Sequence, residues 1–153
     1  MGNDSDTLWN FYQEHCAWER HHEGQRVLVT NILIAIAAGI LGVITFDQHL
    51  APIDLPLTIF LILQGSFGAL FVAKHYERFA RHQRLAKKYR EALDCHFPDS
   101  KILQLRESAD KEHRELSPLL SRLPLHRFWV VLHLLIALSG AALTGIILFS
   151  RAG

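Results

Sequence analysis

Half of the 153 residues are hydrophobic, and the mean hydropathy of +0.13 averages over two unlike parts of the chain. Three apolar runs alternate with strongly polar segments, whose residues are too scattered to build a core of their own. Length and composition therefore predict one domain and exclude a second, soluble one. The net charge of +1 conceals two opposed blocks, an acidic one at the N-terminus and a basic one in the centre of the chain.

The first predicted element is a helix that begins near Asp6 or Thr7, either of which can act as an N-cap, and that ends at about Gly24. Residues 1–26 contain five acidic residues and two arginines, and are rich in aromatic residues. One interpretation places this helix in the membrane interface. Because anionic lipid would repel it, we favour packing against the chain's own basic helix.

Three apolar runs follow, at 27–46, 55–73 and 128–149. A helix rises about 1.5 Å per residue, so about 20 apolar residues span the roughly 30 Å hydrocarbon core. Asp54 can cap the second of these helices, and Pro56 lies in its first turn, where a missing N–H costs little. The sequence predicts an all-α membrane protein, with a transmembrane hairpin at 27–73 and a third span with a short external tail at 128–153.

The orientation follows from the distribution of Lys and Arg. Thirteen of the sixteen lie in residues 74–127, the loop 47–54 has none, and the tail has only Arg151. Because short cytoplasmic loops are rich in Lys and Arg, we expect the N-terminus and residues 74–127 in the cytoplasm and the C-terminus outside. Cys16 and Cys95 are then expected as free thiols.

Residues 74–127 are predicted to hold two more helical segments. No Gly or Pro occurs between Ala73 and Pro98, so the second membrane helix should continue into the cytoplasm with one apolar and one basic face. Ser100 is expected to cap a helix that ends before Pro118, and the two should form an antiparallel cytoplasmic hairpin. The apolar side of the second helix consists of Ile102, Leu105, Ala109 and Leu116. The leucines expected at the inner membrane interface are Leu119, Leu120, Leu123 and Leu125.

Small residues recur at fourfold spacing in all three spans. Such residues let helix backbones approach closely in lipid, either within one chain or between copies in a homo-oligomer. The helix-packing candidates are Ala35, Ala38, Gly39 and Gly42 in the first span, Gly65 and Ala69 in the second, and Ala137, Ala141 and Gly145 in the third.

Four polar residues of the spans are candidates for contacts inside the membrane. Asn31, Ser66 and His133 lie at a similar expected depth, and Gln64 lies deeper. Interhelical hydrogen bonds are the favoured interpretation. A proton or ion path is one alternative, although no acidic residue in any span supports it, and a shallow contact of His133 with lipid headgroups is the other.

The basic face of residues 74–90 carries seven cations against Glu77. Its simplest partner is the anionic inner leaflet; the acidic surface of a cytoplasmic sensor or effector protein is an alternative, and nucleic acid is not expected. These lipid or partner contacts are Lys74, Arg78, Arg81, Arg84, Lys87, Lys88 and Arg90.

Two patterns bear on chemistry. His15, Glu19 and His22 share one helical face beside Cys16, but the tight paired spacings of structural zinc sites are absent, so we favour solvated or packed histidines and predict no metal or cofactor. Arg106 and His113 resemble the Arg-x4–6-His signature of HEPN ribonucleases, which would imply RNA cleavage by this pair. No other catalytic motif occurs, and we do not expect an enzyme.

Residues 7–115 combine an N-terminal helix, a membrane hairpin and a charged continuation, which contains Tyr76-Glu-Arg-Phe79 and Lys87-Lys-Tyr-Arg90. In this order of elements, and with these two stretches as the nearest local signatures, they resemble the SLATT family of small bacterial membrane proteins. It implies an inner-membrane effector that perturbs the bilayer, or an accessory subunit, in anti-phage and nucleotide-signalling systems. The alternatives are the tethered ribonuclease and a passive membrane scaffold.

Overall fold

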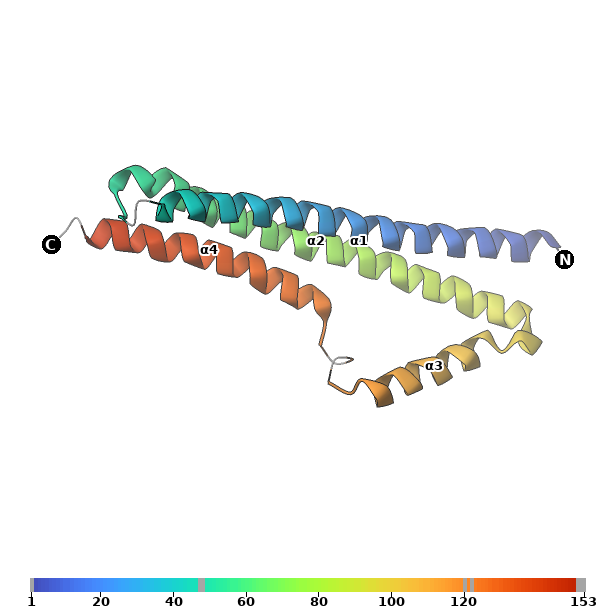
Figure 1. The fold of residues 1–153 in the computed structure, drawn as a ribbon. Helices are drawn as coiled ribbons and strands as arrows, with labels where there is room; N and C mark the ends of the chain where they lie inside the picture. The colour runs from blue at the N-terminus through green and yellow to red at the C-terminus, as the bar shows by residue number, and fades with distance from the viewer. Residues whose placement is uncertain (1, 47–48, 120, 122, 151–153) are drawn as a thin grey trace. The chain divides into compact units, whose positions relative to one another are not determined.

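The structure is a computed structural model that describes residues 2–46, 49–119, 121 and 123–150, and these are almost entirely helical. The elements are α1 (Gly2–Thr45), the short 3-10 helix η1 (Pro52–Asp54), α2 (Leu55–His96), a second 3-10 helix η2 (Pro98–Ser100), α3 (Ile102–Leu116) and α4 (Leu125–Phe149) (Figure 1). The predicted all-α class is confirmed. Among the helices of these residues, α1, α2 and α4 are long and apolar enough to cross a membrane.

α1 corrects the predicted end of the N-terminal helix. The chain does not break at Gly24 but continues through it as one helix of 44 residues. A single glycine costs a helix only about 1 kcal/mol, and Gly24 has no positive φ. At about 1.5 Å per residue, α1 is roughly twice as long as a hydrocarbon core is thick, so its polar N-terminal half has to lie outside any membrane.

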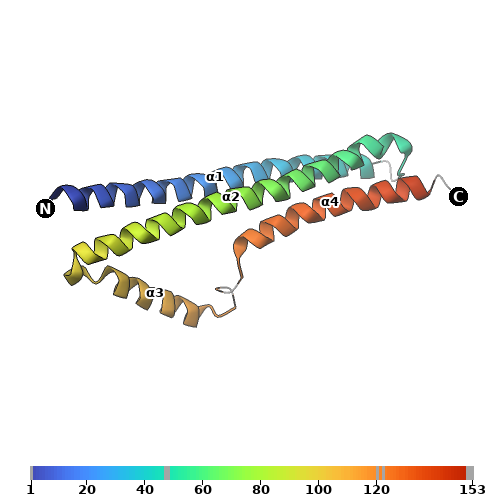
Figure 2. The same cartoon turned by 180° about the vertical axis from the view of Figure 1, so that it is seen from behind.

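The chain forms two compact units, and α1 and α2 are each divided between them, with one half of the helix in each unit. The polar unit consists of Met1–Gly24 and Tyr76–Pro124, and the apolar unit of Gln25–His75 and Leu125–Gly153. In the apolar unit α1, α2 and α4 lie side by side around Ala37, Ile44 and Leu61 (Figures 1 and 2). In the polar unit the first half of α1 runs along the second half of α2, and α3 follows after η2 (Figure 2).

The capping interactions at the N-termini of α2 and α3 differ from the sequence prediction. Ser100 does not cap α3, because its hydroxyl donates to the carbonyl of Phe97 at 2.6 Å. The N-cap is Lys101, with φ of 52°, and the Oδ1 atom of Asp94 on α2 accepts the N–H of Leu103 at 3.1 Å. Asp54 likewise accepts the N–H of Ala51 at 2.9 Å, which closes the turn before α2.

α3 ends at Leu116, before Pro118 as predicted, but its apolar side is not buried. No α3 residue is fully buried, and Leu105 and Leu116 are 68% and 76% exposed. The predicted packed hairpin is therefore not confirmed. Leu119 and Leu123 are also exposed, α4 begins at Leu125 rather than Phe128, and Leu120 and Arg151 lie outside the described residues.

Candidate functional site

Aromatic and histidine rings join α1 to α2 in the polar unit. Phe11 stacks on Tyr89 with ring centroids 5.5 Å apart, and Trp18 stacks on His82 at 5.9 Å. These contacts confirm that the N-terminal helix packs against the basic helix. The packing explains why an acidic, aromatic segment precedes the first apolar run: it covers one side of a strongly basic helix.

His15 and His82 meet at the centre of this contact, with their Nδ1 atoms 3.0 Å apart. Burial, followed by the positive charges of His15, Arg81 and Arg78, lowers the pKa of His82, and Glu14 opposes this. Within the described residues, no three His, Cys, Asp or Glu side chains are placed to hold a metal ion. The histidines of this contact act as packed rings.

The basic residues of α2 fall into two groups. Arg78, Arg81 and Lys88 are exposed on the outer surface of the polar unit, and Lys74 is exposed in the apolar unit. The others line a cavity of about 500 Å³ bounded by α1, α2 and α3. Its lining consists of Tyr12, Cys16, Glu19, Gln83, Arg84, Ala86, Lys87, Arg90, Arg106 and Asp110.

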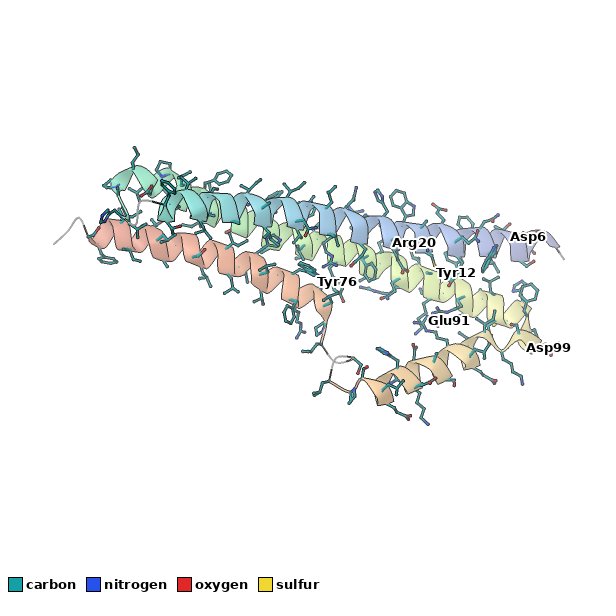
Figure 3. All side chains as sticks on the ribbon, in the orientation of Figure 1. Asp6, Tyr12, Arg20, Tyr76, Glu91 and Asp99 are labelled. Carbon is teal, nitrogen blue, oxygen red and sulfur yellow. The ribbon has the colours of Figure 1, made fainter. Side chains whose placement is uncertain are left out.

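Tyr12 of α1 is one of the residues that line this cavity, and its side chain is labelled in Figure 3. Burial, a hydrogen bond to Cys16 and the charge of Glu19 raise its pKa, so its hydroxyl stays protonated at neutral pH. Burial also raises the pKa of Glu19, against the opposing charges of Arg106, Arg20 and His15. The cavity thus combines four cationic side chains with one neutral hydroxyl and two carboxyls.

The two residues of the HEPN-like pattern lie in different surroundings. Arg106 lines the cavity, where its Nε donates to the Oδ2 of Asp110 at 3.2 Å. His113 lies seven residues further along α3, about 10 Å along the helix axis, and is exposed outside the cavity. No contact in the described part of the chain joins the pair.

In the apolar unit, glycines let α2 and α4 pack backbone against backbone. A Cβ added at Gly65 would lie 2.7 Å from the carbonyl oxygen of His133, and one at Gly140 would lie 2.7 Å from that of Thr58. At Gly68 an added Cβ would meet the ring of His133. The hydroxyl oxygens of Thr58 and Thr144 lie 2.8 Å apart in the same interface.

The polar residues of the spans are brought together only in part. His133 is fully buried, with its Nε2 atom 3.5 Å from the hydroxyl of Thr30, a residue outside the predicted polar set. The side chain of Gln64 donates to the carbonyl of Leu33 at 2.5 Å. Asn31 and Ser66 are exposed on outward faces instead. His133 is therefore in contact with Thr30 and not with Asn31 or Ser66, its predicted neighbours.

The small residues likewise divide between inward and outward faces. Gly65 and Ala137 lie in the α2–α4 interface, together with Gly68 and Gly140, which strict fourfold spacing had missed, and Ala69 is buried. Four residues rotate a helix by about 400°, so a strict fourfold series drifts off a straight seam, whereas mixed steps of three and four stay on it. The small residues that lie away from this seam are Ala35, Ala38, Gly39, Gly42, Ala141 and Gly145.

A cation–π contact closes one end of the apolar unit and was also missed from the sequence. The guanidinium of Arg26 lies 5.2 Å from the ring centre of Trp129, and Arg26 is only 5% exposed. Arg26 is spaced in steps of four, three and four from Thr30, Leu33 and Ala37 on the inward side of α1. That spacing is a signal that the sequence does contain.

Comparisons with protein-family models, with curated proteins and with solved structures find no match to this chain.

Proposed function

We propose that the protein is a bacterial inner-membrane protein that acts by self-association of its membrane helices, as an effector that perturbs the bilayer or as the accessory subunit of a defence-type system. The distribution of Lys and Arg supports a cytoplasmic polar unit and an external C-terminus. The resemblance to the SLATT family supports the effector role. One structural observation carries the self-association, namely the outer face of α1.

This α1 outer face consists of Asn31, Ala35, Ala38, Gly39 and Gly42, and all five are exposed. Ala35, Gly39 and Gly42 lie almost opposite Ala37 and Ile44, the residues that α1 buries in the core. A Cβ added at Gly39 or Gly42 would have no atom within 4 Å in the described part of the chain. The flat face is thus left unused by the folding of one chain.

Asn31 provides a hydrogen-bonding group through which this face can pair with the same face of a second copy. Its amide projects from an apolar segment and makes no hydrogen bond with any residue that the structure describes. A primary amide is both donor and acceptor, so two copies of Asn31 can satisfy each other across a two-fold axis. Interhelical hydrogen bonds in membranes contribute about 0.6 kcal/mol on average and up to about 1.7 kcal/mol.

Cysteine crosslinking in native membranes tests this proposal in a Cys16→Ser, Cys95→Ser background. Ala35→Cys should form a disulfide-linked dimer on oxidation. Ala142→Cys, an exposed alanine on α4, and Ala37→Cys, a buried alanine on α1, should stay monomeric. A chain that crosslinks equally at all three positions, or at none, would show that the α1 outer face is not the interface.

Two matched pairs of substitutions connect the interface to activity. Asn31→Leu should lower the dimerisation constant about threefold to twentyfold, which corresponds to the hydrogen-bond energies given above. Ser66→Leu should leave the dimerisation constant unchanged. Gly39→Leu should abolish crosslinking, whereas Gly145→Leu should preserve it. For the effector role, overproduction of the wild-type chain should cause a growth defect and dye leakage, and Gly39→Leu should remove both; a harmless wild-type chain would refute that role.

A further inference from the structure

The cavity of the polar unit has more positive charge than its own carboxylates neutralise. Its cations are Arg84, Lys87, Arg90 and Arg106, and its carboxyls are Glu19 and Asp110. Two of the four cations have partners, since Arg106 pairs with Asp110 at 3.2 Å and Lys87 pairs with Glu91 at 3.7 Å. Arg84 and Arg90 form no ion pair with any residue that the structure describes.

Arg90 is the most telling of these side chains. Its Nε atom is buried and has no hydrogen-bond partner among the described residues. A buried donor without an acceptor is costly, more so on a charged group, and native structures seldom leave one unsatisfied. The planar guanidinium offers paired N–H groups that match two oxygens of one phosphate or carboxylate, so an anion in the cavity would satisfy this atom.

We propose that this cavity binds a small phosphate-bearing anion, with Arg90 and Arg84 as its principal ligands and Tyr12 as a neutral hydrogen-bond donor. A volume of about 500 Å³ lies in the range of small-molecule sites and exceeds what a single inorganic phosphate fills. A diphosphate or a phosphate ester therefore fits better than a simple ion. Two unpaired arginines favour a ligand with two or more negative charges over a monocarboxylate.

Glu19 sets the sign of the pH dependence. Because burial raises its pKa, this carboxyl loses its negative charge more readily than an ordinary glutamate as the pH falls. A neutral Glu19 no longer repels the anion. Affinity for a phosphate whose own charge is constant should therefore increase as the pH is lowered through the titration of Glu19, and Glu19→Gln should bind it more tightly at neutral pH.

Calorimetric titration of the full chain in a neutral detergent with inorganic pyrophosphate tests whether the cavity binds a soluble phosphate. Arg90→Gln and Arg84→Gln should each weaken binding roughly tenfold, as expected for loss of a charged hydrogen bond. Lys88→Gln removes the same charge from an exposed position of α2 outside the cavity, and should change the affinity less than twofold. Arg84 is exposed, so its replacement tests the site even if Arg90→Gln unfolds the unit.

The second arm tests a lipid headgroup as the source of the phosphate. Native mass spectrometry of the chain released from nanodiscs that contain phosphatidylglycerol should show retained lipid in the wild type and in Lys88→Gln, and loss in Arg84→Gln and Arg90→Gln. Selective loss in either arm supports the cavity and identifies the source. Absence of binding in both arms, or equal loss in the Lys88→Gln control, would overturn the proposal. Neither result depends on self-association through the α1 outer face.

Discussion

The Nδ1 atom of His15 on α1 lies 3.0 Å from the Nδ1 atom of His82 on α2. One ring has to donate the proton and the other has to accept it, so this bond requires that at least one imidazole is neutral. If both rings are protonated, two like charges face each other where the N-terminal helix meets the basic helix. The contact between α1 and α2 in the polar unit is thus coupled to pH.

Acidification should destabilise the polar unit. Burial and the nearby positive charges lower the pKa of His82 below its usual value of 6.5, so the unfolded chain binds more protons than the folded one as the pH falls. Stability should be complete above about pH 6.5 and should decrease below it. Thermal unfolding of the detergent-solubilised chain, followed by tryptophan fluorescence, measures this.

A variant that keeps an aromatic ring at position 82 but cannot be protonated tests the cause of the pH effect. His82→Phe can still stack on Trp18 and should flatten the dependence of the melting temperature between pH 5 and pH 7. His113→Gln changes an exposed histidine on α3 and should leave the dependence as in the wild type. An unchanged pH profile in His82→Phe would show that other groups control it.

A methyl group added at Gly65 should disrupt the α2–α4 interface. The new Cβ would meet the backbone of Ala137 and His133, which cannot move without shifting α4, and overpacking of this kind costs about 1–3 kcal/mol. Gly145→Ala meets nothing within 4 Å and should be neutral or slightly stabilising. Unfolding titrations in mixed micelles compare the two variants, and equal stabilities would contradict the close approach.

Gly68 and His133 should be energetically coupled. A Cβ at Gly68 would collide with the Nδ1 atom of the His133 side chain, and the three nearest atoms all belong to that ring. Gly68→Ala should therefore cost about 1–3 kcal/mol alone but much less in a His133→Ala background, where the ring is gone. A double-mutant cycle measures the coupling, and additive effects would place the two residues apart.

Asp94 should hold the start of α3. Its carboxylate accepts the N–H of Leu103, so Asp94→Ala should cost about 0.5–2 kcal/mol in this helix. Asp99→Ala removes an equal charge from η2 and should have little effect. Since no residue of α3 is fully buried, the loss should appear as faster amide exchange at the first turn of α3. Equal exchange in both variants would argue against the cap.

The apolar segments could be predicted from the sequence because burying backbone polar groups in lipid demands long uninterrupted helices, and 27–46, 55–73 and 128–149 have that length and composition. A second local rule, that Gly and Pro interrupt helices, predicted that α2 continues past Ala73 and that α3 stops before Pro118. It failed at Gly24 and Ser100. A glycine tolerated within a helix and one at its end look alike in sequence, and the cap of α3 comes from Asp94 on another helix.

What only the tertiary structure decided is which face of each helix meets which neighbour. Period and composition identified small and polar residues in every span, but could not tell that Gly65 and Gly140 lie in an interface while Gly39 lies outside it. Nor could they bring Tyr12, Arg90 and Arg106 to one cavity from three separate helices. The physical reason is that hydrophobicity fixes how deep a residue lies, whereas contacts depend on rotation about the helix axis, which side-chain packing settles.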